Sequence, residues 1–583
     1  MIYTLTFSKL AASFFSALML VASLYALGRL VHARLKWRDA GFDAALVTGM
    51  ALNHLVFLLL SMCFEGGTTV MLMHILHIVS LAMAVIRHPR WFQPVRRMTL
   101  SPAVILLVLY LPYLFSPVSP PMNYDAMFAY VHNAEWVYHH GLAFNPSSTA
   151  YTTMPMGAEY LFAQAFPIGG KLSIFLLDAL FGVLLVRRAY HIAARHLSER
   201  AALLLVLALL LVPEGIPFLF GIAKVDTINI YLIITGFGWL LERDHPFKHW
   251  FALIAFSMAC AVKYTGWLQL SFPVGIIVIM LIRAKGISKG LFAALIPLLF
   301  IGPVLVKNLV QTGNPFVGLK WSPGQQVYVE QHAGMTKADL SRKIVGNIEQ
   351  KKDLVKTAIQ LSYFYQNFVL YGILMLMIMI ALALRVHIAD LGWPLLFLFA
   401  ALAPWHFFVG TTLQPPRFLM AFYHVIILLC FMIGARILNQ RKISTAVLLR
   451  YGFMVAFSLT FFNTYYRHGS RVTRFLQSQQ VPLHQWYEQS GNYVFSITSK
   501  LRDEGWLCQR IMYVSPVAKG LLTTDQLSTD HADSGRWAYR NNFSVMRDRY
   551  DYVLCNEQDI LKYGLQNRPV MLQSGHMFLI KLN

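Results

Sequence analysis

Charged residues are scarce in this sequence. Only 13% of the 583 residues are Asp, Glu, Lys or Arg, whereas 57% are apolar, and the mean hydropathy is +0.53. A soluble protein carries about twice that share of charged residues, so the composition excludes an ordinary soluble chain. Acidic residues are fewer than basic ones: the sequence has 27 Asp and Glu and 49 Lys and Arg, which gives a net charge of +22.

Several motifs that carry chemistry are missing as well. The sequence has no Gly-x-x-x-x-Gly-Lys-Ser/Thr phosphate loop, no dinucleotide-binding glycine pattern after a strand and no His-Glu-x-x-His zinc motif. With no cytoplasmic domain expected, ATP or a soluble nucleotide sugar is a poor candidate for a direct substrate. No cleavable signal is evident, because the first apolar segment lacks a small-residue cleavage site and its basic flank follows it. We expect a retained first helix that enters from outside.

Cysteine is also rare, with five residues in the chain. Cys63, Cys260 and Cys430 lie in apolar segments, where we expect them to be packing residues. Cys508 and Cys555 lie in a C-terminal segment that is expected to be external, where a disulfide survives. A disulfide between these two residues and two separate buried thiols are both open.

Long apolar runs are what the sequence has in abundance. A helix needs roughly 20 apolar residues to cross the hydrocarbon, and by that length the chain contains about fourteen spans. They lie near 10–32, 43–64, 68–87, 100–117, 171–187, 200–221, 225–241, 249–265, 268–283, 290–310, 362–384, 393–410, 418–437 and 444–462. The predicted class is an α-helical, polytopic membrane protein.

The positive charge follows the loops between these spans. Basic clusters occur in alternate short loops: 32–38, 87–97, 187–200, 283–289 and 436–442. This alternation is the positive-inside rule, so the expected partners of these residues are anionic lipid headgroups rather than nucleic acid. The long loops 118–170 and 311–361 and everything after residue 462 are then external. We expect a bacterial inner or plasma membrane, with the functional face outside.

A change in composition divides the chain into two parts. Residues 1–462 are the predicted membrane body, and residues 463–583, which have no long apolar run, are a predicted external domain. Pro482 to Arg502 has the pattern of an amphipathic helix. Short strands are expected at Arg510–Val514, Tyr550–Leu554, Val570–Leu572 and Met577–Ile580. The external domain is therefore predicted to be a small α/β domain.

The loop 118–170 begins with an acidic and aromatic stretch, Asn123-Tyr124-Asp125. Asn123 is a plausible N-cap for a helix over 124–140. Such a helix places Asp125, His132, Glu135 and His139 within about 80° of one another, with an apolar side that includes Val131 and Ala134 and faces the bilayer interface. Asp125 is positioned to accept a proton from an incoming hydroxyl group. The alternative is a carboxylate that only interacts with the helix dipole.

A second acid and three cations are expected near the same face. Asp226 lies at the outer start of a span, where an acid usually marks a site; an ion pair with Lys224 is the alternative. Lys263, Lys307 and Arg417 lie near outer helix ends and contradict the positive-inside pattern. A phosphate or pyrophosphate ligand explains them, since Arg offers a bidentate fork and Lys a point charge. Snorkelling to headgroups is the alternative.

Histidine is the remaining candidate for metal chemistry. His132, His139 and His140 lie in the predicted helix 124–140. Single histidines on helix faces are usually structural, so we expect no metal and no other cofactor.

These residues, in this order, resemble the GT-C superfamily of membrane glycosyltransferases, of the mannosyltransferase or aminoarabinose transferase type. The resemblance covers roughly residues 100–440. It rests on Asn123-Tyr124-Asp125 with Trp136–Gly141, Val225-Asp226-Thr227, Ala261–Gly266, Lys307-Asn308 with Thr312–Phe316, and Arg417-Phe418. What the resemblance implies is an inverting transfer of a sugar from a polyprenyl-phosphate carrier to an acceptor hydroxyl.

The resemblance also implies roles for individual residues. Asp125 matches the first-loop acid that deprotonates or orients the acceptor, and Asp226 matches the second-loop acid. Lys263 and Arg417 match contacts to the carrier phosphate. The expected substrate site is completed by Tyr124, His132, Glu135 and Lys307. Asp125 stands alone where many members have paired acids, which argues against the metal-dependent branch, and three additional spans precede the first loop.

Two other functions are consistent with the sequence. A transporter or flippase for a lipid-linked or anionic solute predicts charges near the midplane and paired half-helices, whereas these spans carry few central charges and show no visible halves. A polymerase or ligase for surface polysaccharide also uses a polyprenyl-linked donor, and no feature of the sequence separates it from a glycosyltransferase. The expected partners are a polyprenyl-phosphate-linked sugar, an acceptor glycan, lipid or protein, and membrane lipids.

Overall fold

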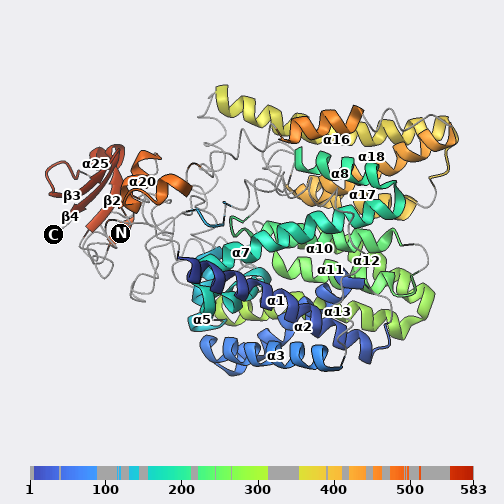
Figure 1. Cartoon of the computed structure of the whole chain (residues 1–583), viewed down its shortest axis with the longest axis horizontal. Helices are drawn as coiled ribbons and strands as arrows, with labels where there is room; N and C mark the ends of the chain where they lie inside the picture. Colours follow the sequence, from blue (N-terminus) through green and yellow to red (C-terminus); the bar gives the residue numbers. More distant parts are fainter. Residues whose placement is uncertain are drawn as a thin grey trace.

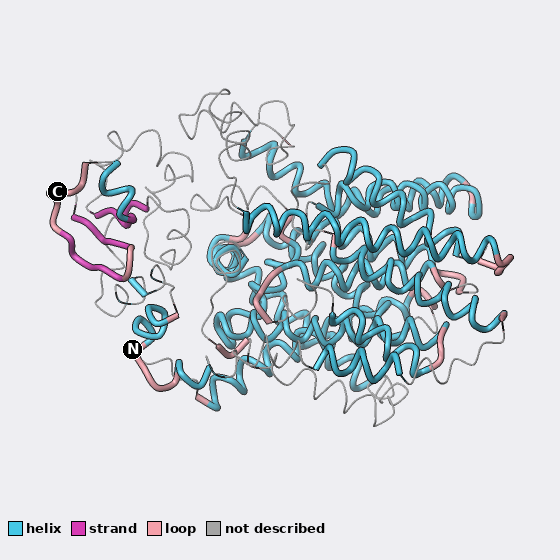
Figure 2. The backbone as a smooth tube through the Cα atoms, turned by 90° about the horizontal axis from the view of Figure 1, so that it is seen from above, coloured by secondary structure: helices cyan, strands magenta, loops and turns pink. Residues whose placement is uncertain are grey.

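The computed structural model shows long helices that run side by side in a bundle and a small group of strands apart from them (Figures 1 and 2). The described residues are 6–37, 41–87, 115, 117–119, 130–142, 155–211, 221–242, 245–263, 265–312, 315, 354–388, 391–409, 419–441, 451–461, 473, 475–490, 493, 496–497, 500, 511–513, 552–562 and 564–581.

Within these residues, six helices are long and apolar enough to cross a membrane by length and composition. They are α1 (Phe7–Arg34), α2 (Gly41–Cys63), α3 (Gly66–Arg87), α7 (Gly157–His196), α13 (Ile287–Thr312) and α18 (Met420–Gln440). The other helices of the bundle are α5 (His132–His140), α8 (Glu199–Leu211), α10 (Val225–Leu240), α11 (Lys248–Val262), α12 (Thr265–Lys285), α16 (Leu354–Ala383), α17 (Gly392–Val409) and Tyr451–Phe461. The chain is an integral, multi-pass membrane protein.

The predicted spans coincide with these helices. Each one overlaps a described helix, except the span near 100–117, which lies largely outside the described residues. Large apolar side chains are exposed on outward faces, for example Ile78, Leu298 and Leu382, each about 60% exposed. Such side chains are stable when lipid rather than water surrounds the bundle.

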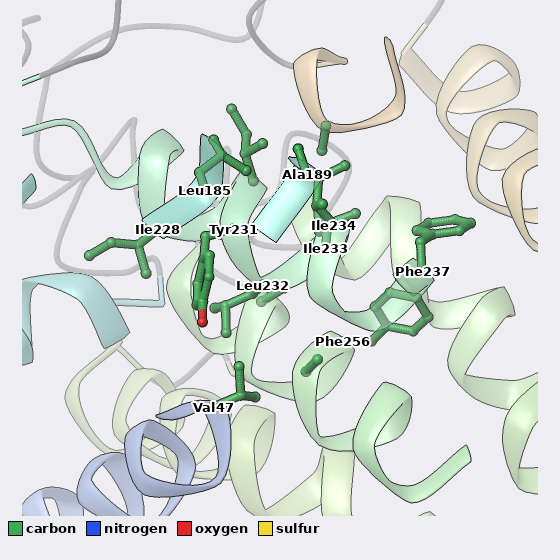
Figure 3. Close-up of a cluster of buried hydrophobic side chains, with 14 of the residues drawn as sticks. Val47, Leu185, Ala189, Ile228, Tyr231, Leu232, Ile233, Ile234, Phe237 and Phe256 are labelled. Carbon is green, nitrogen blue, oxygen red and sulfur yellow. The ribbon is translucent and has the colours of Figure 1, made fainter. Parts of the chain in front are cut away.

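The interior of the bundle is formed mainly by α10 and its neighbours. Every residue of α10 is buried. Figure 3 shows Tyr231 and Phe237 of α10 packed among Phe256 of α11, Leu185 of α7 and Val47 of α2. A helix that is apolar on all sides is stable only at the centre of a bundle, and this position brings the first residues of α10 inside the protein.

Helix α7 contains a kink near its start. Gly170 has φ 62° and ψ −153°, and Pro167 supplies no N–H, so regular helical hydrogen bonding is interrupted here. Serine hydroxyls bind the carbonyls at this break: Ser16 donates to Ala165 O at 2.9 Å and Ser13 to Gly169 O at 3.0 Å. Helix α1 thereby fixes the short first segment of α7, which carries Glu159.

The C-terminal part contains a four-stranded sheet of order β1-β2-β4-β3. The strands are β1 (Ile511–Tyr513), β2 (Tyr552–Asn556), β3 (Val570–Ser574) and β4 (Met577–Lys581). β1 pairs parallel with β2, whereas β4 pairs antiparallel with β2 and β3. Strands thus lie at all four predicted segments, and α20 (Leu483–Gln489) lies within the predicted helix 482–502. Cys508 lies outside the described residues and Cys555 is buried in β2, so their pairing stays a prediction.

Candidate active site

Three helix ends that carry charge meet at one side of the bundle. Asp226 lies in the first turn of α10 and Glu159 in the first turn of α7, whereas Lys263 caps the C-terminus of α11. These are the positions that the helix dipole favours for each sign. The start of α7 lies directly against the end of α11, since a Cβ on Gly157 would be 2.8 Å from Ala261 O. Residues far apart in sequence are therefore brought together here.

Asp226 and Lys263 form a buried ion pair. Lys263 Nζ lies 2.5 Å from Asp226 Oδ1, and the two side chains are 11% and 5% exposed. Lys224 was the alternative partner expected from the sequence; the structure gives Asp226 a pair with Lys263, 37 residues away. Removing either charge would leave the other buried, so the two residues act as a unit.

Glu159 and Lys307 lie near this pair. Glu159 is 3% exposed and follows Gly157, which packs against Ala261 two residues before Lys263. Its Oε2 atom has no hydrogen-bond partner among the described residues. Lys307 Nζ, from α13, lies 3.9 Å from Met156 Sδ at the N-cap of α7. This region thus brings two acids and two lysines together, and the lysines are the groups that an anionic ligand would contact.

A buried aspartate fixes the turn that leads into α10. Asp178 of α7 accepts hydrogen bonds from the backbone N–H groups of Ile222 and Ala223, both at 3.1 Å, and from the Thr227 side chain. Ala223 has φ 58°, an unfavourable conformation for a residue with a side chain. The hydrogen bonds to Asp178 stabilise it and so set the direction in which Asp226 enters the site.

The remaining predicted site residues are placed as follows. Asp125, Tyr124 and Arg417 lie outside the described residues. In α5, Glu135 is buried and pairs with Lys171 at 3.0 Å, and His132 is half-buried. Val131 and Ala134 are buried in the core, so the expectation that this side of the helix faces the bilayer interface is wrong: α5 packs on α7 instead. Asp226, Lys263 and Lys307 are the predicted residues that the structure brings together.

Two acids of this region, Glu159 and Asp178, were not predicted. Each is an acid inside a long apolar helix, which is an unusual place for a carboxylate and was the available signal. Among the described residues, no group of three or more His, Cys, Asp or Glu side chains is arranged to hold a metal ion.

A second buried network lies further along α7 and α10. Asp43 of α2 pairs with Arg187 at 2.9 Å and with Arg188 at 3.7 Å, and Tyr231 donates a hydrogen bond to it at 3.0 Å. Arg188 is 2% exposed, so the expectation that this basic cluster meets lipid headgroups is wrong for that residue. The network joins α2 to α7 and α10.

Comparisons with known proteins give the fold. No protein-family model matches the sequence, and no curated protein matches it. The chain is similar to the solved structure of ArnT from Cupriavidus metallidurans in the apo state, with 12% identity, a TM-score of 0.50, and coverage of 82% of this chain and 97% of that chain. The structure of ArnT bound to undecaprenyl phosphate gives the same identity and coverage with a TM-score of 0.49.

A more distant similarity is to the Archaeoglobus fulgidus oligosaccharyltransferase in complex with Zn and sulfate. It has 13% identity and a TM-score of 0.38, and it covers 79% of this chain and 68% of that chain. ArnT is an aminoarabinose transferase of the GT-C family. The resemblance to GT-C enzymes inferred from the motifs is confirmed at the level of the fold.

Proposed function

We propose that this chain is a membrane glycosyltransferase that moves a sugar from a polyprenyl-phosphate carrier to an acceptor hydroxyl, with inversion, on the outer face of the membrane. The observation that carries the proposal is the buried Asp226–Lys263 pair with Lys307 beside it, where the ends of α10, α11 and α13 meet. Partly buried lysines at this position provide positive charge for a phosphate group next to hydrocarbon.

The proposed reaction uses these lysines together with Asp125 and Arg417, the roles of which come from the resemblance in sequence. The acceptor oxygen forms a bond to the anomeric carbon of the sugar, and the bond from that carbon to the phosphate oxygen breaks. Asp125 accepts the proton of the acceptor hydroxyl, as a general base. The polyprenyl phosphate leaves with its negative charge, which Lys263, Lys307 and Arg417 stabilise; such electrostatic stabilisation is usually the largest catalytic contribution. Asp226 holds Lys263 in place at 2.5 Å.

The other predicted residues and the C-terminal part have supporting roles in this proposal. Tyr124, His132 and Glu135 lie in the loop that brings the acceptor to Asp125. The segment 463–583 is an external domain that selects the acceptor or covers the site.

The test is transfer from a radiolabelled polyprenyl-phosphate sugar pool in membranes that contain the wild type or Asp125→Asn. The wild type is expected to transfer label, and the variant to lose activity by about 10²-fold or more, the usual contribution of a general base. Activity of the variant within about threefold of the wild type would remove Asp125 from the proposed role. Glu242→Gln, at the far end of α10, is the matched control and is expected to stay active.

No transfer by the wild type from any common carrier sugar would contradict the proposed reaction and favour transport, which a flux assay in proteoliposomes detects. Asp226→Asn and Lys263→Ala serve as a second pair of variants. Since each leaves its partner buried without a counter-charge, both are expected to lose activity, and the double variant to be little worse than either one.

A further inference from the structure

The turn that leads into α10 is bound by the buried carboxyl group of Asp178. Its Oδ2 atom accepts hydrogen bonds from the N–H groups of Ile222 and Ala223, both at 3.1 Å. Asp178 comes from the middle of α7 and is 0% exposed. A buried N–H group without an acceptor is costly, so this one oxygen atom satisfies two donors that the fold would otherwise leave unpaired.

The backbone of the turn is strained at residue 223. Ala223 has φ 58° and Gly221 has φ 66°, so both residues are in the left-handed region. Glycine adopts this conformation readily, whereas a residue with a Cβ atom does so only at a cost. The hydrogen bond from Ala223 to Asp178 offsets that cost, and the side chain of Ala223 is itself buried in the core. The turn therefore depends on Asp178 at a particular residue.

The ion pair of the site begins directly after this turn. α10 starts at Val225, and Asp226 lies in its first turn. Asp226 Oδ1 is 2.5 Å from Nζ of Lys263, which caps the C-terminus of α11. A change in the path of the turn moves the start of α10 and the carboxylate with it. Because Asp226 holds Lys263, the position of the ammonium group depends on the same turn.

We propose that Asp178 is a positioning residue for the transfer reaction: it keeps Ala223 in the left-handed conformation and thereby holds the Asp226–Lys263 pair in place for the carrier phosphate. The inference rests on the proposed function, which assigns the phosphate to Lys263. What the turn requires from Asp178 is an acceptor oxygen atom, and a side-chain amide supplies one as well as a carboxyl group does. The role is therefore independent of the charge on this residue.

Two substitutions of Asp178 separate the acceptor oxygen from the charge. Asp178→Asn keeps an oxygen atom for the two N–H groups, so its turnover is expected to be within about threefold of the wild type. Asp178→Leu keeps the branched shape of the side chain but has no acceptor. Its turnover is expected to fall by about 10- to 100-fold, because a misplacement of about 1 Å at a reacting group can cost that much.

A second substitution, Ala223→Gly, gives a result that a merely structural role of Asp178 does not predict. Glycine adopts the left-handed conformation without help, so in the Asp178→Leu protein this change is expected to restore turnover by about tenfold. Alone it is expected to leave turnover near the wild type. The matched control is Ala252→Gly in α11, which also removes a buried methyl group but at a helical position. It is expected to leave Asp178→Leu as slow as before.

The experiment measures the initial rate of label transfer from an excess of the radiolabelled polyprenyl-phosphate sugar pool. Each full-length variant is purified and reconstituted in nanodiscs. Thermal unfolding of every variant gives the folded fraction, and each rate is divided by that fraction. A variant that is only less stable then has the turnover of the wild type, whereas a variant with a displaced ion pair is slow although it is folded.

Three results would overturn the role of Asp178 while the wild type transfers label, and these leave the proposed function intact. They are wild-type turnover by folded Asp178→Leu, a loss of about tenfold or more in folded Asp178→Asn, and equal rescue by Ala223→Gly and Ala252→Gly. If Asp178→Leu does not fold, Asp178→Asn still decides, because its activity depends on the acceptor oxygen alone. No transfer by the wild type would overturn the proposed function, and this inference with it.

Discussion

At the scale of single residues, removal of Asp43 should leave buried positive charge without its counter-charge. It is the counter-charge for Arg187 and Arg188, and Tyr231 donates a hydrogen bond to it. Asp43→Asn keeps an acceptor for Tyr231 but leaves two guanidinium groups without their carboxylate. Because Arg188 is buried, we expect a loss of about 3 kcal/mol or more in the free energy of unfolding.

Denaturation of the purified protein in detergent, followed by tryptophan fluorescence, measures this loss. The control is Glu242→Gln, which breaks the pair between Glu242 and the half-exposed Arg195. Exposed pairs contribute less than about 1 kcal/mol, so the control should unfold near the wild type. Equal losses in the free energy of unfolding of the two variants would contradict the expectation that a buried ion pair contributes more than an exposed one.

Residue identity predicted the site only in part. Lysines at the ends of apolar helices indicated an anion site, and Asp226, Lys263 and Lys307 do come together. The partner of Lys263 was not predictable, because it is set by the packing of α10 against α11 and not by sequence distance. Glu159 was missed for the same reason: a lone acid in an apolar helix does not indicate which helices it faces.

At the level of helices, α1 and α2 cross so closely that only glycine fits between them. A Cβ on Gly28 would lie 1.7 Å from Ala45 O, and one on Gly49 would lie 1.8 Å from Leu24 O. Small residues allow such close contact between helices in lipid. Since the obstacle is backbone, Gly49→Ala has to push the helices apart, and we expect it to cost about 1–3 kcal/mol.

Gly302→Ala is the matched control, because a Cβ on Gly302 in α13 meets nothing within 4 Å. Alanine is the better helix former by about 1 kcal/mol, so this change should leave stability unchanged or raise it. Both variants are compared by thermal unfolding in the same detergent. A Gly49→Ala protein as stable as the wild type would show that α1 and α2 do not need this close crossing.

Helix boundaries were less predictable than helix positions. The apolar run 171–187 predicted a span, but α7 begins at Gly157 and ends at His196. Pro167 and Gly170 are residue types typical of loops. The structure keeps the segment helical because Ser13, Ser16 and Ser173 bind the carbonyls that the kink frees. Those serines lie on two different helices, so this compensation depends on tertiary packing.

For the whole molecule, the decisive property is which side of the membrane holds the charged cluster. Basic residues in alternate loops predict that the C-terminus of α18 faces the cytoplasm and that the C-terminus of α5 and the sheet lie outside. In a background with Cys63→Ser and Cys508→Ser, an impermeant maleimide should label His140→Cys and Gln573→Cys in intact cells. Arg441→Cys should be labelled only after permeabilisation. All three positions are exposed.

The orientation bears directly on the donor. Soluble nucleotide sugars are made in the cytoplasm, so a site on the outer face has to take its sugar from a carrier that crosses the membrane. Lysines beside hydrocarbon suit the phosphate group of such a lipid carrier. If the labelling pattern were reversed, the cluster of Glu159, Asp226, Lys263 and Lys307 would face the cytoplasm. The cell would then have no need of a lipid-linked donor at this site, and the proposed reaction would lose its main physical argument even with the fold unchanged.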